Sequence, residues 1–146
     1  MRKTLILACL GAIGAVTLGA GEKALMHCFA FTVIDSASPA EWEAFNKATD
    51  ALPGKIPGIK KVWRGQLRAP LQIFNTDAET RKKVAAGEEK ISGPVTRLLR
   101  KSGVCMEMAD EATLKSYADH AYHKEWLSAY EKVRVAGTTT FDIVAQ

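Results

Sequence analysis

The segment from Met26 to Ile34 is mainly apolar, and its side chains alternate between two faces. One face carries His27, Phe29, Phe31 and Val33, and no Pro or Gly interrupts the run. Aromatic and β-branched residues with a period of two predict a strand that is buried on both sides. Because His27 shares the phase of the phenylalanines, we expect its side chain to point to the same face.

A second apolar pattern, with the period of a helix, follows the sequence Ser38-Pro39-Ala40-Glu41. This tetrapeptide is a capping box with proline at the first helical position. Trp42, Phe45 and Leu52 then recur at spacings of three and seven, so they share one helical stripe. The sequence therefore predicts a helix that ends at about Leu52, where Pro53-Gly54 follows.

Three later segments have the period and composition of strands. They are Ile59 to Trp63, which ends near Gly65, Val104 to Ala109, and Thr138 to Val144. Between the last two, Asp110 is placed to cap a helical region. The order β-α-β-β-α-β predicts an α+β domain of ferredoxin-like type, in which helices cover one face of an antiparallel sheet.

The helical region after Asp110 carries two apolar stripes. The first contains Leu114, Tyr117, Ala118 and Ala121, and the second contains His123, Trp126, Leu127 and Tyr130. On an unbroken helix, His123 would lie about 120° around the axis from Tyr117. Since both residues belong to apolar stripes, both should face the core. We therefore predict that the helix bends or restarts between Asp119 and Ala121.

Residues 66–102 form an insertion between the second and third strands. Thr76-Asp77-Ala78-Glu79 is another capping box, and a charged helix is expected to follow to about Ala86. Glycines then interrupt the chain, and Val95 to Lys101 is interpreted as a short basic helix. Two roles stay open for this helical insertion: a solvated excursion, or a lid or dimer contact.

The face of the sheet opposite the helices also needs a cover. Cys28, Ala30 and Ile34 give the first strand an apolar surface on that side. A second copy of the chain is the obvious cover for such a face. We therefore expect a homodimer that forms through the sheet.

The first twenty residues differ in kind from the rest of the 146-residue chain. Arg2 and Lys3 precede an uncharged run from Thr4 to Ala20, which is the pattern of a secretory signal peptide. Residues 1–20 are interpreted as a leader and residues 21–146 as a single domain. Because the run is short for a membrane span, we expect a periplasmic or secreted protein without membrane attachment after signal removal.

Removal of the leader changes both the charge and the cysteine count. The net charge falls from +4 to +2, and so small a charge without a basic stripe argues against nucleic acid as a partner. Cys9 is lost with the leader, which leaves Cys28 and Cys105. An exported compartment permits a disulfide between them, and the sequence leaves open whether it forms.

The region from Tyr117 to Trp126 concentrates titratable and aromatic side chains. If the helix breaks as predicted, Tyr117 and His123 reach one cavity together with His27. That cavity would be lined by the apolar residues Phe29, Phe31, Trp42, Phe45, Met106 and Trp126. An apolar concavity with a few convergent polar groups is typical of a site for a small apolar or aromatic ligand. There His123 is suited to act as a general base, and Tyr117 as a hydrogen-bond donor to a carbonyl or enolate oxygen.

Two other interpretations of these residues remain open. In the first, Tyr117 and His123 are core residues whose polar atoms bond to the backbone. In the second, His120 and His123 ligate zinc or iron together with nearby carboxylates, although the two histidines fall on different stripes. The chain has no glycine-rich phosphate loop, G-x-S-x-G elbow or H-E-x-x-H motif, so a nucleotide-binding or hydrolase function lacks support. No cofactor is expected.

At these positions the chain resembles the stress-responsive A/B barrel family, the Dabb domain. Members open with a histidine in the first strand, here His27, and their first helix ends in a Leu-Pro…Ile-Pro-Gly segment, here Leu52 to Gly58. Their second helix carries Tyr-x-x-His-Pro-x-His, which Tyr117 to His123 matches except that Ala121 replaces the proline. Their last strand contains an aspartate, here Asp142. The resemblance extends from the first strand to the last, outside the insertion.

The resemblance implies a ferredoxin-like α+β domain that dimerises sheet to sheet into a barrel. It implies no established activity for most relatives. In a similar plant polyketide cyclase, the tyrosine and second histidine of the motif promote an intramolecular aldol cyclisation. Those roles would fall on Tyr117 and His123, with His27 lining the same cavity. The expected functions are therefore a ligand-binding dimer, a lyase or cyclase, or a non-catalytic structural or stress-protective dimer.

Overall fold

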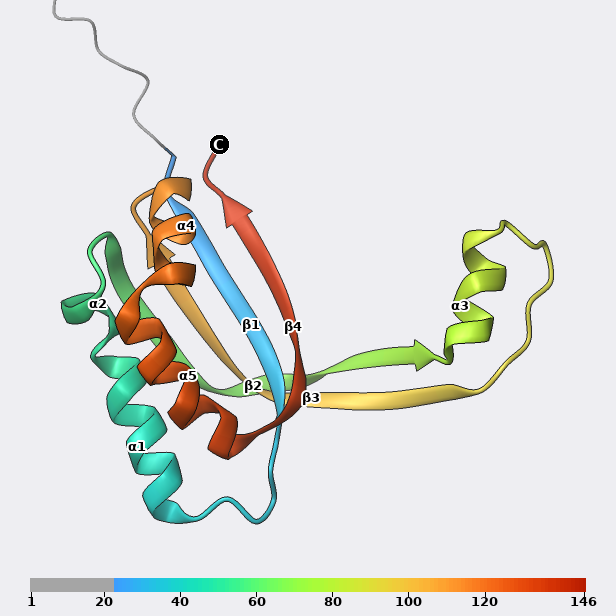
Figure 1. Cartoon of the computed structure of the whole chain (residues 1–146), viewed down its shortest axis with the longest axis horizontal. Helices are drawn as coiled ribbons and strands as arrows, with labels where there is room; N and C mark the ends of the chain where they lie inside the picture. The colour runs from blue at the N-terminus through green and yellow to red at the C-terminus, as the bar shows by residue number, and fades with distance from the viewer. Residues whose placement is uncertain (1–22) are drawn as a thin grey trace, which may run out of the picture.

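A four-stranded antiparallel sheet and a layer of helices make up the body of the protein (Figure 1). The computed structural model describes residues 23–146, and the expected leader lies outside the described residues. The strands, in the spatial order β2-β3-β1-β4, are β1 (Leu25–Val33), β2 (Ile59–Thr76), β3 (Val95–Met108) and β4 (Arg134–Val144). The helices on one face of the sheet are α1 (Pro39–Asp50), α2 (Leu52–Lys55), α4 (Glu111–Asp119) and α5 (Ala121–Val133). The predicted α+β fold is confirmed.

The first helix starts where the capping box predicts. The Ser38 hydroxyl accepts a hydrogen bond from the Glu41 N–H (3.3 Å), and the Glu41 carboxylate accepts one from the Ser38 N–H (2.8 Å). α1 ends at Asp50, slightly before the predicted end, and the short α2 follows. Leu52, the last residue of the predicted stripe, is fully buried. Within residues 23–146, none of the helices is long and apolar enough to cross a membrane.

Aromatic side chains fill the space between the helices and the sheet. Phe31 of β1 contacts Tyr130 of α5 edge to face, with ring centroids 5.0 Å apart. The Trp126 indole N–H donates to the Thr49 hydroxyl (2.9 Å), which donates in turn to the Phe45 carbonyl (2.7 Å). These hydrogen bonds satisfy the buried polar atoms and hold α5 against α1.

The insertion between the second and third strands is an arm of two strands with a helix at its tip (Figure 1). β2 and β3 continue past the body as a ribbon, whose last pair is Thr76 with Val95. α3 (Ala78–Ala85) is the predicted charged helix, although its N-cap is Asp77 and not Thr76. The arm therefore holds one of the two predicted helices.

The predicted basic helix from Val95 to Lys101 is wrong, because this segment belongs to β3. Its residues pair with residues 71–76 of β2 in antiparallel register. A run of seven residues is too short for its periodicity to separate helix from strand, and the cross-strand pairing decides. The insertion is consequently a ribbon over most of its length.

The sheet face opposite the helices is apolar and carries a disulfide. Cys28 and Cys105 are directly opposed in the register of β1 and β3, and an S–S bond joins them. Trp63, Phe141 and Ile143 share this face and are 42%, 49% and 58% exposed. Exposed apolar side chains gathered on one face of a small domain form a surface that another molecule can cover.

Candidate functional site

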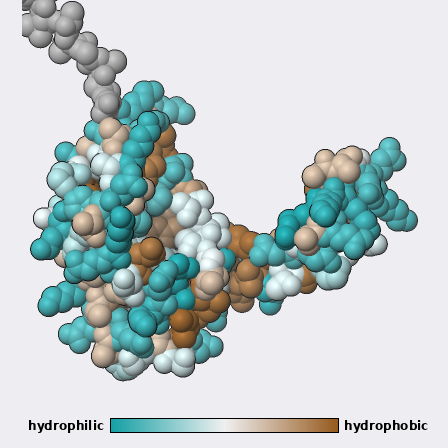
Figure 2. Space-filling view, viewed as in Figure 1, coloured by the Kyte–Doolittle hydropathy of each residue, from teal (hydrophilic) through white to brown (hydrophobic). Residues whose placement is uncertain are grey.

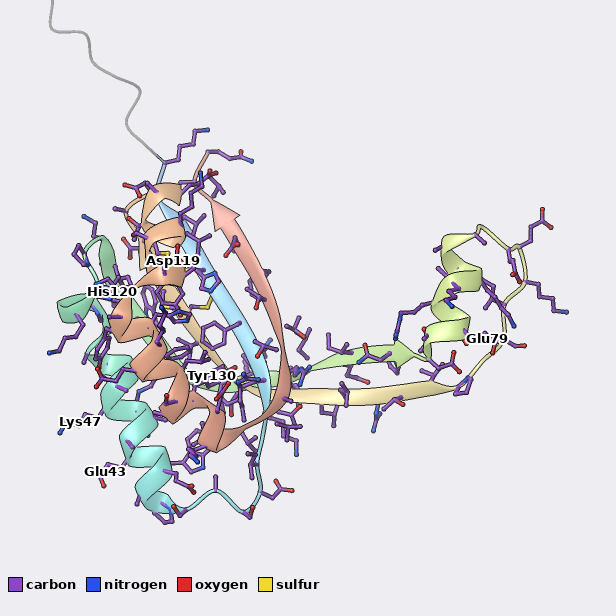
Figure 3. The ribbon with its side chains drawn as sticks, viewed as in Figure 1. Glu43, Lys47, Glu79, Asp119, His120 and Tyr130 are labelled. Atoms are coloured by element: carbon purple, nitrogen blue, oxygen red, sulfur yellow. A yellow bond between two sulfur atoms is a disulfide. The ribbon has the colours of Figure 1, made fainter. Side chains whose placement is uncertain are left out.

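The helical region after β3 is broken at the position that the two stripes predict. α4 ends at Asp119, His120 is extended (φ −65°, ψ 138°), and α5 begins at Ala121. Figure 3 shows Asp119 and His120 at this junction. The His120 imidazole caps α5, since its Nδ1 accepts a hydrogen bond from the Tyr122 N–H (3.1 Å). A histidine cap therefore produces the break without a proline.

The break brings Tyr117 and His123 together. Their ring centroids are 4.2 Å apart, although the two residues lie on different helices. His27 of β1 reaches the same group, with its ring centroid 5.8 Å from that of Tyr117. The three residues singled out from the sequence thus form one cluster between the sheet and the helices.

A fourth residue, Asp142 of β4, completes the cluster. His27 and Asp142 are direct cross-strand partners, and the distance from His27 Nδ1 to Asp142 Oδ1 is 2.7 Å. Because a carboxylate accepts, Nδ1 carries the proton and Nε2 of His27 points away from this bond. From the sequence, Asp142 is recognised only as the aspartate of the last strand, and no partner for it is predicted. The signal that could have found the pair is the adjacency of the first and last strands in a ferredoxin-like sheet.

His123 is oriented by the end of α4. Its Nδ1 lies 3.1 Å from the Ala118 carbonyl oxygen. Since a carbonyl can only accept, Nδ1 donates and Nε2 carries the lone pair. Burial lowers the pKa of His123 below its usual value, with His27 acting in the same direction and the Ala118 bond opposing it. The neutral imidazole therefore presents an unprotonated Nε2, as a general base requires.

Tyr117 has the complementary chemistry. It is 5% exposed, and burial raises the pKa of its phenol well above the usual range, so the hydroxyl stays protonated. Although the residue is buried, its hydroxyl oxygen is not one of the fully buried side-chain atoms that lack a hydrogen-bond partner among residues 23–146. The protonated Tyr117 hydroxyl can donate a hydrogen bond to a ligand.

Of the six apolar residues expected to line a ligand pocket, five are core residues and one lies at the edge of the core. Phe29, Phe31, Phe45, Met106 and Trp126 are buried in the core, and Trp42 is half-buried beside it. Trp126 stacks at 5.6 Å on His123 and forms an apolar wall of the cluster.

A separate cavity of about 540 Å³ lies at the other end of β1. Its wall includes Phe31, Trp42 and Phe45, together with Arg64 and Lys101. Phe31 is four residues from His27 along the strand, a distance of about 13 Å. This cavity is therefore distinct from the Tyr117–His123 cluster, although it uses three of the expected lining residues.

The second interpretation of the histidines, a metal site, has less geometric support. His120 uses Nδ1 to cap α5, and His123 uses Nδ1 to donate to the backbone. Within the described part of the chain, no three His, Cys, Asp or Glu side chains are grouped so that they could hold a metal ion.

No family model matches the chain, and no curated protein matches it in sequence. Solved structures do have the same fold. A Dabb family protein with a ferredoxin-like fold from Mesorhizobium loti is 17% identical, with a TM-score of 0.55 over 86% of this chain and 99% of its own. A dimeric ferredoxin-like protein from Thermobifida fusca is 18% identical, with a TM-score of 0.55 over 85% of this chain and 92% of its own.

A hydroxynitrile lyase from Passiflora edulis is 10% identical, with a TM-score of 0.57 over 85% of this chain and 94% of its own. Together these similarities define the class of the fold: an α+β protein of the dimeric ferredoxin-like type.

Proposed function

We propose that this chain is an exported, homodimeric protein of the Dabb family that binds a small apolar or aromatic ligand at the cluster of His27, Tyr117 and His123. The observation that carries the proposal is the contact between the Tyr117 and His123 rings, with centroids 4.2 Å apart, in which burial keeps the phenol protonated and the imidazole neutral. Tyr117 supplies a donor and His123 an acceptor, and the Trp126 ring stacks on His123. A ligand with a carbonyl or hydroxyl group next to an apolar body fits this combination.

The sheet face and the fold neighbours support the homodimer. Trp63, Phe141 and Ile143 leave a large apolar area uncovered in one copy. Solved structures with this fold are described as dimeric. A two-fold axis through the sheet face would cover the same residues in both copies.

Export is supported by the leader pattern and by the disulfide. Cys28 and Cys105 are bonded, and such bonds persist in oxidising compartments outside the cytosol. The family assignment is supported by the motif residues and by the fold that this chain shares with a Dabb protein.

A second candidate function is a lyase that uses the same residues. A hydroxynitrile lyase shares the fold, so a cyanohydrin is a reasonable first substrate to test. His123 Nε2 would accept the hydroxyl proton as the bond between the carbinol carbon and the nitrile carbon breaks, and the departing cyanide would take this proton from His123 to give HCN and the neutral imidazole. Tyr117 would donate a hydrogen bond to the oxygen that becomes the carbonyl.

The test uses residues 21–146 and the matched variant His123→Ala. Native mass spectrometry should give the mass of a dimer, and acetophenone, which combines an aromatic ring with a carbonyl, should perturb the NMR signals of His27 and His123. Release of benzaldehyde from mandelonitrile, absent in His123→Ala, would favour the lyase. A dimer in which neither probe gives a response, in the wild type as in His123→Ala, would instead indicate a structural role.

A further inference from the structure

The arm formed by residues 66–102 stands away from the body, and neither function considered above uses it (Figure 1). From the pair Leu71–Arg100 outward, its two strands pair with each other only. An isolated two-stranded ribbon is marginally stable in water. The arm therefore needs a surface to pack on.

Both faces of the ribbon carry apolar side chains among polar ones. Cross-strand partners share a face, so Ile73 and Leu98 lie on one side, whereas Phe74 lies on the other. Phe74 and Val95 are 62% and 60% exposed. Figure 2 shows hydrophobic residues along the ribbon where it leaves the body. Phe74 and Val95 share one face of the ribbon, and exposed apolar side chains gathered in this way are a surface that another molecule can cover.

The apolar surface of the arm is continuous with the open face of the sheet. A cavity of about 620 Å³ lies where the two meet. The base of the arm contributes Leu67, Ala69, Pro70 and Leu71 to its wall, and the sheet contributes Cys28, Ala30, Trp63 and Phe141 among others. Whatever covers the sheet face therefore also reaches the arm.

The charges of the arm and the body are complementary. Residues 66–102 contain eight Lys and Arg but four Asp and Glu, whereas the remainder of residues 23–146 contains ten and eleven. The acidic side chains of the body include Glu43 of α1, which points outward in Figure 3. The arm (8 − 4, net +4) and the nearly neutral body (10 − 11, net −1) therefore do not repel each other.

We infer that the arm of each copy lies on the body of a second copy and clasps the dimer. This inference rests on the homodimer proposed above. The ribbon would bury Phe74 and Val95 against the partner, and the two-fold axis would make the exchange of arms reciprocal. The insertion is then a dimer contact, one of the two roles that the sequence left open.

The first experiment compares Phe74→Ser on the arm with the matched variant Phe141→Ser on the sheet face. The Phe74 and Phe141 side chains are 62% and 49% exposed in one copy, so neither substitution should disturb the fold. Near-ultraviolet circular dichroism checks that the fold is kept. Analytical ultracentrifugation of residues 21–146 gives the dimer dissociation constant. If the arm clasps the partner, each substitution raises this constant at least about tenfold.

The second experiment identifies what the arm touches. Protein labelled with ¹⁵N carries the photoreactive residue benzoylphenylalanine at position 74. It is mixed with unlabelled wild-type protein and irradiated. Cross-links from labelled position 74 to unlabelled residues 23–65 or 103–146 are the expected result.

The two proposals fail in different ways. A chain that is monomeric at all concentrations tested overturns both the homodimer and the clasp. A dimer that Phe141→Ser weakens and Phe74→Ser leaves unchanged overturns the clasp alone. Cross-links confined to the labelled copy also overturn the clasp, because the arm would then fold back on its own body.

Discussion

Tyr117 and His123 lie with their ring centroids 4.2 Å apart, although an unbroken helix would turn them about 120° away from each other. The chain achieves this contact by ending α4 at Asp119 and starting α5 at Ala121. Burial then moves the two pKa values in opposite directions: the phenol remains a donor and the imidazole remains an acceptor. The pair thus offers one hydrogen-bond donor and one acceptor side by side.

The Tyr117 hydroxyl leads to a prediction that distinguishes a role in ligand binding from a role in folding stability. If this hydroxyl serves a ligand and not the fold, Tyr117→Phe should leave the free energy of unfolding nearly unchanged. The affinity for acetophenone should fall about fivefold, the equivalent of about 1 kcal/mol for a lost hydrogen bond. Urea unfolding and NMR titration measure the two quantities.

Tyr130→Phe is the matched control, since the Tyr130 hydroxyl does have a partner, the Thr138 hydroxyl at 3.2 Å. This control should lose about 1 kcal/mol of stability and keep its ligand affinity. The reverse pattern, with Tyr117→Phe destabilised and binding unchanged, would mean that Tyr117 is a core residue without a ligand role.

The bend could be predicted because two apolar stripes cannot share one straight helix. What stabilises the bend could not be predicted from the pattern, since position 121 holds Ala where the Dabb motif that the chain resembles has proline, and the cap is an imidazole. From its sequence position, His120 is considered only as a metal ligand beside His123 and not as a cap, because a histidine cap depends on a side-chain rotamer and not on periodicity.

The cap geometry predicts that Ala121→Pro is tolerated. Position 121 is the first residue of α5, where proline loses no helical hydrogen bond, and the extended His120 suits a residue before proline. The free energy of unfolding in urea should stay equal or rise by up to about 1 kcal/mol.

Ser128→Pro, in the middle of α5, is the control and should cost about 3 kcal/mol or more. Equal destabilisation of both variants would contradict the helix boundary at His120.

Long-range pairing is the part of the structure that the sequence could not supply. The His27–Asp142 bond, the Cys28–Cys105 disulfide and the extension of β3 through Val95 all depend on strand register. Each residue has an unremarkable local environment in the sequence, and its partner lies 19 or more positions away. Periodicity identifies a strand and its faces, whereas register is fixed by the packing of the whole sheet.

The disulfide gives a prediction about stability. Cys28 and Cys105 are 77 residues apart, so their bond restricts a large part of the unfolded chain. The double variant Cys28→Ala/Cys105→Ala should lose about 2–4 kcal/mol in free energy of unfolding. Urea unfolding with and without reductant measures this loss. Reductant should destabilise the wild type and leave the double variant unchanged; equal behaviour of the two proteins would show that the bond does not form.

The lowered pKa of His123 predicts how stability depends on pH. Above the unfolded value of about 6.5, the imidazole is neutral in both states and pH has no effect through this residue. Below it, the unfolded chain binds a proton that the folded chain resists, because folding buries His123 next to His27. Stability should therefore be lost as the pH falls from about 7 through the folded pKa.

His123→Gln removes this titration and keeps a polar side chain of similar length. The difference in unfolding free energy between pH 7 and pH 5 should be smaller in this variant than in the wild type, as measured in urea at both pH values. NMR titration of the His123 ring in the folded protein gives the second readout, a midpoint below that of a free histidine. A midpoint above the free value would reverse the sign, since folding would then favour the charged imidazole, and His123 could not serve as the neutral base at the site.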